Sequence, residues 1–302
     1  MTAALAVFAA DLVSRFRRQR PLRGGSLIVT IFGDSILPRG GAITLGSLIR
    51  LADPFGLNER LVRTAATRLA HDGWVVAQRD GRLSEYRLSP GGRERFVEAT
   101  RRIYGPGSGP WSGKWTLIVL PPREAAARRQ LRKELSWHGF GELQSGVFAH
   151  PAVDAAGLAA RAWQTPLPKN ALIFEADLTS QSASALIERG WDLKDLALRY
   201  QRFVQRFERA ATLLQREPDT ASAFLVRTLL IHEYRRFHLR DPLLPEQLLP
   251  ADWPGTRAAQ LCRDIYRRVF EPSEVYLSAV AENLKGKLPP PGSDIRERFG
   301  GL

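Results

Sequence analysis

The sequence predicts an α+β protein built from several domains, and three patterns of apolar residues support this fold class. Within the first hundred residues, two short helical patterns precede two strand-like patterns. Residues 111–178 combine strand-like and helical patterns, whereas residues 190–288 have helical spacing only. At 302 residues the chain is long enough for each region to bury a core.

The composition describes a globular chain with an excess of positive charge. Its 44 Lys and Arg residues outnumber 31 Asp and Glu residues, and the formal net charge is +13. Such an excess favours polyanionic partners but does not determine the fold. The single cysteine, Cys262, excludes an intramolecular disulfide and a multi-cysteine zinc site, which suits a cytoplasmic protein.

The N-terminal segment predicts a helix that docks on the body of the protein. One helical face carries Leu5, Phe8, Leu12 and Phe16. The apolar part precedes the charged part and is too short to cross a bilayer. We therefore expect neither a secretion signal nor a membrane partner.

Residues 58–71 predict an amphipathic helix that follows Asn58, a residue type that caps helix N-termini. A shorter helical pattern begins after Thr44, and Pro54 and Gly56 mark the turn between the two. The apolar side of the second helix carries Leu61, Val62, Ala65, Ala66 and Leu69. Its opposite side carries Arg60, Arg63, Thr64 and Thr67, with Arg68 at the flank.

Two strand-like runs flank Asp80–Gly81 and predict a β-hairpin, because this dipeptide suits a turn with positive φ. We expect the side chains facing inward to be Trp74, Val76, Tyr86 and Leu88, with Arg79 and Arg82 at the tip. Helix, turn, helix and hairpin in this order form a winged helix-turn-helix, which we assign to residues 1–103. Residues 104–110, YGPGSGP, then predict a linker.

The second helix of this pattern has the chemistry of a DNA-reading surface. Arginine pairs bidentately with guanine, and the methyl group of threonine contacts thymine in the major groove. Arginines of the hairpin reach phosphate or the minor groove. Two alternatives remain open: a merely solvated helix face, or a scaffold that uses its winged helix for protein contacts. The predicted DNA-binding residues are Arg60, Arg63, Thr64, Thr67, Arg68, Arg79 and Arg82.

Several long motifs resemble the PaaX-type repressors of phenylacetate catabolism, from about residue 26 to the final helices. They include IVTIFGDSILPRGG, LGSLIRLADPFGLNERLVRTAATRLAHDGW, WSGKWTLIVLP and LIHEYRRFHLRDPLLPEQLLPADWPG. The resemblance implies a central ferredoxin-like (Cas2-like) domain over 111–178 and a helical effector and dimerisation domain over 190–288. Residues 289–302 would form a flexible tail.

The same resemblance implies a function. It describes a homodimer that represses transcription from double-stranded operator DNA. Release from the operator would follow binding of an aryl-CoA thioester such as phenylacetyl-CoA.

Residues 219–241 predict a largely apolar helix that also carries cationic groups. If these groups are buried, they must be paired. One interpretation is an internal network of hydrogen bonds and ion pairs. The other is an effector pocket, in which arginines hold phosphates and an aromatic side chain stacks on the aryl group. The candidate effector-binding residues are His232, Tyr234, Arg235, Arg236 and Trp253.

The sequence predicts no catalytic residue, no cofactor and no metal site. His232 and His238 are six residues apart, whereas a zinc-binding pair on one helix face is four apart. In Cas2 nucleases a metal-binding aspartate follows the first strand, but Pro121 follows the corresponding run here. The alternative function is a nucleic-acid-processing enzyme that uses the Cas2-like centre. The missing aspartate argues against this alternative, so we predict that the protein is not an enzyme.

Overall fold

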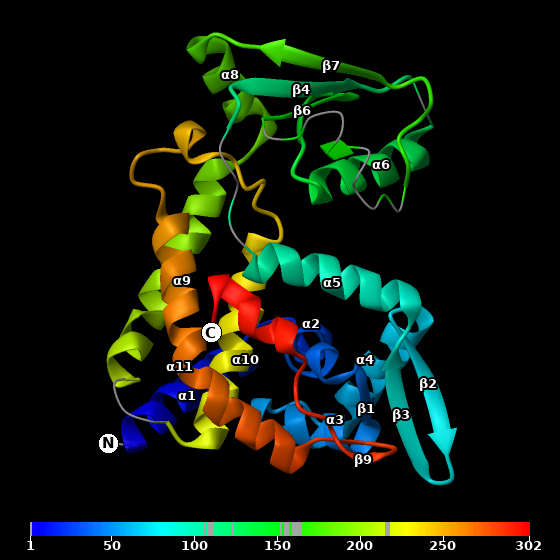
Figure 1. The fold of residues 1–302 in the computed structure, drawn as a ribbon, viewed down its shortest axis with the longest axis vertical. Helices are drawn as coiled ribbons and strands as arrows, with labels where there is room; N and C mark the ends of the chain where they lie inside the picture. The colour runs from blue at the N-terminus through cyan, green and yellow to red at the C-terminus, as the bar shows by residue number, and fades with distance from the viewer. Residues whose placement is uncertain are drawn as a thin grey trace. The chain divides into compact units, whose positions relative to one another are not determined.

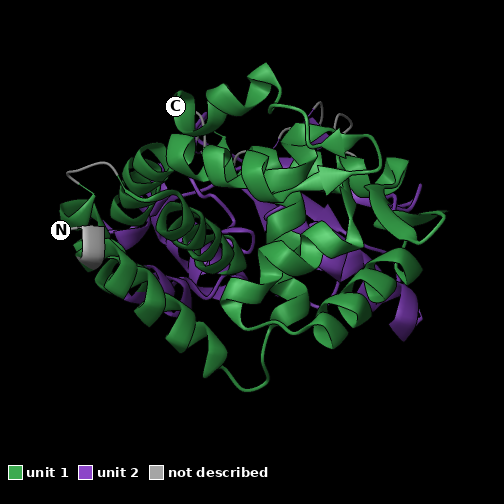
Figure 2. Ribbon diagram, turned by 90° about the horizontal axis from the view of Figure 1, so that it is seen from below, with its two compact units in different colours: residues 1–105, 203–236, 257–302 green, residues 106–202, 237–256 purple. Residues whose placement is uncertain are grey.

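A computed structural model of the chain describes residues 2–105, 107, 111–122, 124–151, 153, 157–158, 163, 165–214 and 218–302 (Figure 1). The predicted linker at 104–110 lies for the most part outside these residues. The chain divides into two compact units (Figure 2). Unit 1 comprises residues 1–105, 203–236 and 257–302, and unit 2 comprises residues 106–202 and 237–256. The division into three domains stays a prediction.

Unit 1 begins with helices that build its core. They are α1 (Thr2–Arg17), α2 (Gly24–Ile31), the π-helical turn η1 (Phe32–Ile36), and the 3-10 turn η2 (Leu37–Arg39). The predicted docking of the first helix is confirmed, since Leu5, Phe8, Leu12 and Phe16 are all buried. Phe8 packs edge-on against Phe207 with ring centroids 6.5 Å apart.

The next elements form a helical pair and a small sheet. They are β1 (Ala42–Thr44), α3 (Leu45–Ala52), the 3-10 turn η3 (Asp53–Phe55), α4 (Glu59–His71), β2 (Val75–Asp80), β3 (Leu83–Leu88) and α5 (Pro90–Tyr104). The sheet is antiparallel with the strand order β1-β3-β2. The two helices, their turn and the hairpin thus follow one another as the sequence predicts.

The rest of unit 1 comes from the C-terminal part of the chain. Its elements are most of α9 (Leu193–Leu213), α10 (Thr220–His238) and α11 (Pro254–Val280), then β8 (Glu282–Asn283), β9 (Gly286–Lys287) and η5 (Ser293–Gly300). The expectation of a loose tail is corrected here. Ile295 is 3% exposed and Arg298 is 4% exposed, because both side chains pack into unit 1.

Unit 2 is a four-stranded antiparallel sheet with helices on both faces. Its elements are β4 (Lys114–Val119), α6 (Ala125–Trp137), β5 (Gly141–Gln144), β6 (Val147–His150), β7 (Leu172–Asp177), α8 (Ser180–Gly190) and η4 (Glu246–Leu248). The strand order is β5-β6-β4-β7. Successive strand residues face opposite sides, so Ile118 and Phe148 pack with α6 whereas Trp115 and Ala149 pack with α8.

Candidate nucleic-acid interface

The turn between α3 and α4 fixes how the second helix is presented. The Thr44 hydroxyl accepts a hydrogen bond from the Ser47 amide at 3.3 Å, and the Asn58 side chain accepts one from the Leu61 amide at 2.9 Å. Gly56 has φ of +77°, and a Cβ there would lie 2.2 Å from Arg17 Nε. Any other residue at this position would therefore strain the turn and displace the Arg17 side chain.

The buried side of α4 is made of small and medium apolar side chains. Val62, Ala65, Ala66 and Leu69 are buried, as the sequence predicts. Leu61 is an exception, because 42% of it is exposed. It therefore lies beside the polar face and not in the core.

The polar face of α4 carries every predicted DNA-binding residue of this helix in an exposed position. Arg63 Nη2 forms an ion pair with Glu59 Oε1 at 2.6 Å, and Arg68 Nε lies 3.7 Å from Asp72 Oδ2. The Thr64 hydroxyl donates to the Arg60 carbonyl at 2.8 Å. The two carboxylates were missed in the sequence, although their spacing of four residues from each arginine is the spacing of helical ion pairs.

The hairpin of β2 and β3 forms as predicted, with Arg79 and Arg82 exposed near its tip. Gly81 has φ of +55°, which the predicted turn requires. The expectation for Val76 was wrong. Val75 is 1% exposed, whereas Val76 is 52% exposed. Val75 pairs with the buried Leu88 and faces the same side of the sheet, and Val76, one residue further along the strand, faces the opposite side.

The candidate effector residues belong to both units. Trp253 is in unit 2, where it packs on Tyr200 with ring centroids 5.8 Å apart. The other four lie on α10 in unit 1. Tyr234 is 1% exposed and packs on Phe203, so a ligand ring can stack on it only if α10 rearranges.

His232 and Arg235 make internal hydrogen bonds with α2. His232 Nδ1 lies 3.1 Å from the Thr30 hydroxyl, to which Arg235 Nε donates at 2.8 Å. Arg235 Nη2 also donates to the Ser26 carbonyl at 2.6 Å. Arg236 lies 3.6 Å from Glu233. These contacts correspond to the internal network that was one of the two interpretations of the sequence.

Burial shifts the pKa values of His232 and Arg235. It lowers the pKa of His232 well below its usual value, and Arg235, Arg236 and Arg23 lower it further by repulsion. Burial also lowers the pKa of Arg235, to about 10. At neutral pH the imidazole is therefore neutral and the guanidinium remains charged.

Unit 1 contains a buried charge cluster that the sequence did not predict. Asp34 Oδ2 accepts from Arg227 Nε at 2.7 Å, and Asp34 Oδ1 accepts from Arg298 Nη1 at 2.8 Å. The hydroxyls of Tyr104 and Tyr266 donate to the same carboxylate at 2.7 and 2.8 Å. An aspartate within the apolar run IVTIFGDSI was the signal, because a buried carboxylate requires partners.

This cluster holds Asp34 ionised. Burial alone would raise the pKa of the carboxyl group, but Arg227 and Arg298 outweigh that effect and lower it. Burial and the nearby Asp34 carboxylate raise the pKa of Tyr104 well above its usual value, so its hydroxyl stays protonated and donates. The cluster is a structural anchor that joins η1, α5, α10, α11 and the C-terminal segment.

The described residues offer no site for metal chemistry and no membrane span. No group of three His, Cys, Asp or Glu side chains among them is arranged to hold a metal ion. None of their helices combines the length and the hydropathy that crossing a bilayer demands.

Three family models match successive parts of the chain. "PaaX-like protein" matches residues 23–92, "PaaX protein central Cas2-like domain" matches residues 108–187, and "PaaX-like protein C-terminal domain" matches residues 191–279. The chain belongs to the PaaX family.

One particular relative is the "Transcriptional repressor PaaX" of Escherichia coli (strain K12). It is 39% identical over 289 residues, which cover 93% of this chain and 92% of the relative. That relative is a regulator and not an enzyme, in agreement with the prediction from the sequence. A solved structure of an uncharacterised protein from Mycobacterium tuberculosis is 26% identical, with a TM-score of 0.49, and covers 75% of this chain and 89% of its own.

Proposed function

We propose that the protein is a ligand-responsive transcriptional repressor that binds operator DNA as a homodimer in the cytoplasm. The observation that carries the proposal is the exposed face of α4, with Arg60, Arg63, Thr64, Thr67 and Arg68, in a chain 39% identical to a transcriptional repressor. Occupation of the promoter by the protein would prevent transcription.

The details of the fold in this proposal rest on the order of the elements. The sequence α3, turn, α4, hairpin and the sheet order β1-β3-β2 support a winged helix-turn-helix in which α4 enters the major groove. The order β5-β6-β4-β7, with α6 connecting β4 to β5 in the chain, supports a ferredoxin-like centre. Arg79 and Arg82 would then contact phosphates or the minor groove.

The homodimer is supported by the edge of the unit 2 sheet. Among the strands that the structure describes, β7 pairs with β4 alone. It exposes three consecutive apolar residues, since Leu172, Ile173 and Phe174 are 56%, 45% and 47% exposed. An uncovered apolar edge strand favours association, and a second copy could pair with it symmetrically.

The proposed effector is an aryl-CoA thioester, with phenylacetyl-CoA as the candidate. Release requires that the thioester bind the DNA-free conformation more tightly than the DNA-bound one. A hundredfold preference corresponds to about 2.7 kcal/mol of coupling. The assignment of His232, Tyr234, Arg235, Arg236 and Trp253 to the effector stays a prediction, and the contacts of His232 and Arg235 favour the internal network.

The test is titration of the purified chain with its operator, obtained by selection from a pool of randomised duplexes. Arg63→Ala should weaken operator binding by roughly 1–3 kcal/mol and relax the preference at one base pair. Arg82→Ala should weaken all duplexes alike and reduce the salt slope by about 1. Arg209→Ala, an exposed arginine on α9, is the matched control.

Phenylacetyl-CoA at micromolar concentration should dissociate the complex, whereas free phenylacetate lacks the phosphates and should not. Wild-type binding that is independent of duplex sequence would contradict the proposed repressor. Equal action of the free acid and the thioester would contradict the proposed effector.

A further inference from the structure

A hollow in unit 2 lies between α6 and the β5–β6 turn, and its described lining includes none of the residues assigned above. Its volume is about 420 Å³. It is lined by Ala125, Arg128, Arg129, Arg132, Glu142, Gln144 and Ser145. A hollow of this size accommodates a nucleotide-sized group.

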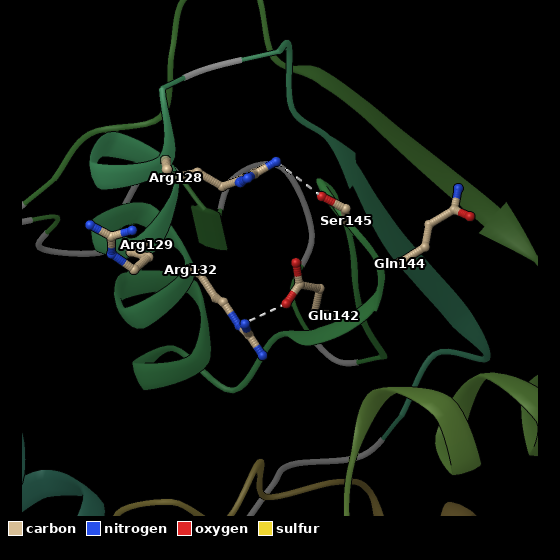
Figure 3. A pocket seen from close by; sticks show the side chains of 7 residues that line it. Arg128, Arg129, Arg132, Glu142, Gln144 and Ser145 are labelled. Atoms are coloured by element: carbon tan, nitrogen blue, oxygen red, sulfur yellow. Dashed lines mark hydrogen bonds and ion pairs between the residues drawn. The ribbon is translucent and has the colours of Figure 1, made fainter.

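Two arginines cross the hollow from the helix to the strand side. Arg128 and Arg132 are four residues apart, so they project from the same face of α6. Figure 3 shows both guanidinium groups turned toward the residues of β5 and its turn, with Arg129 at the margin. Arg128 Nη1 donates to the Ser145 hydroxyl at 3.3 Å, and Arg132 Nε lies 2.7 Å from Glu142 Oε2. These contacts hold the guanidinium groups in place without using all of their donors.

The charge of the lining favours an anionic ligand. The residues that line the hollow carry three guanidinium groups and one carboxylate. Arg129 makes no hydrogen bond or ion pair with any residue that the structure describes. The side chain of Arg132 is 63% exposed and that of Glu142 is 20% exposed, so solvent reaches the arginine end of this ion pair and weakens it. A phosphate can therefore replace Glu142 as the partner of Arg132 at small cost, since arginine binds phosphate bidentately.

The shape and the residue types favour a small phosphorylated molecule over a nucleic acid. Among the described residues, the lining has no aromatic side chain on which a base of a single strand would stack. The Glu142 carboxylate lines the hollow, where it would repel the continuous phosphates of a duplex.

We propose that Arg128 and Arg132, with Arg129 at the margin, bind the phosphate groups of a small nucleotide-bearing ligand. This inference rests on the proposed function where it identifies the ligand as the effector. The bound phosphates are then those of its coenzyme A portion. The aryl end then extends out of the hollow, because the described lining offers it no aromatic side chain and only Ala125 as an apolar residue.

The experiment measures binding of coenzyme A to the full chain by calorimetry without DNA. The double variant Arg128→Ala/Arg132→Ala should bind coenzyme A at least about tenfold more weakly than wild type, because charge-assisted hydrogen bonds are lost. Lys133→Ala removes a charge from the same helix outside the hollow and should leave binding unchanged. Glu142→Gln removes the competing carboxylate and should tighten binding. Circular dichroism and thermal unfolding establish that each variant is folded.

Duplex binding by the same variants separates the two proposals. Unchanged duplex affinity in the double variant, together with weakened coenzyme A binding, supports the assignment. If wild type binds coenzyme A in this way but binds no duplex selectively, the hollow is still a nucleotide-phosphate site and the repressor proposal fails. The assignment is overturned if wild type does not bind coenzyme A, if the double variant binds it as well as wild type, or if the double variant loses duplex affinity alone.

Discussion

Arg63 illustrates how the role of a single residue depends on its neighbours. Its guanidinium lies on the face predicted to read DNA, but in the free protein it is held by Glu59 at 2.6 Å. Both side chains are more than half exposed, so the pair is weak and a duplex can displace it. The carboxylate nevertheless opposes the approach of phosphates.

Glu59→Gln should therefore tighten duplex binding, by up to about 1 kcal/mol at low salt, because it frees Arg63 and removes a negative charge from the interface. The measurement is a salt series of duplex titrations. Glu208→Gln, an exposed glutamate on α9, should have no effect. Weaker binding by Glu59→Gln would show that the ion pair positions Arg63 for the duplex.

His232 should make the stability of unit 1 depend on pH. The pKa of His232 is lowered in the folded state. Below the unfolded-state pKa of about 6.5, the unfolded chain therefore binds a proton at this histidine whereas the folded chain does not. The contribution of His232 to the free energy of unfolding is thus fully present above about pH 6.5 and decreases as the pH falls. Between about pH 7.5 and about pH 5.5, this histidine alone should lower the free energy of unfolding by about 1.4 kcal/mol.

His232→Gln cannot take up that proton and should lose correspondingly less stability over the same interval. Urea unfolding of both proteins at the two pH values measures the difference, and the remaining four histidines, common to both, cancel. Equal losses in the two proteins would mean that His232 is protonated in the folded chain.

Strand β7 lies at one edge of the unit 2 sheet. Its neighbours β4, β6 and β5 lie to one side, and its apolar residues at 172–174 are exposed. Among the described strands only β4 pairs with it, so β7 is an edge strand of this sheet.

Phe174→Lys should shift the protein from dimer to monomer in sedimentation equilibrium, because a charge replaces the apolar contact at the proposed interface. Operator affinity should fall with it, since one half-site is then lost. Val7→Lys, at an isolated apolar residue that is 70% exposed, is the control. An unaltered dimer would place the interface elsewhere.

At the scale of the whole molecule, the Asp34 cluster joins segments from both ends of the chain. Residues 34, 104, 227, 266 and 298 meet at one carboxylate. The last ten residues thus belong to the same compact unit as α3 and α4.

Arg298→Met should lower the free energy of unfolding by about 3 kcal/mol, because it leaves a buried carboxylate with one cationic partner fewer. Arg296→Met, only two residues away, should lower it by less than about 1 kcal/mol, since its ion pair with Glu271 is exposed. Urea denaturation of both variants tests the comparison. Equal effects would indicate that the C-terminal segment is not anchored through Arg298.

The sequence by itself determined the elements whose signals are local. Asn58 caps α4, Gly81 makes the hairpin turn, and the period of α4 separates its cationic face from its apolar face. Capping, turn geometry and helical period act over a few residues, so they can be read without knowledge of the fold.

Tertiary structure decided what depends on residues far apart in the chain. The strand register buried Val75 and exposed Val76. The pairing of Asp34 with Arg227 and Arg298 fixed a tail that was expected to be loose, and the hollow of α6 exists only because β5 returns beside that helix. The physical reason is that burial and charge pairing depend on which distant segments meet, and no local pattern encodes that meeting.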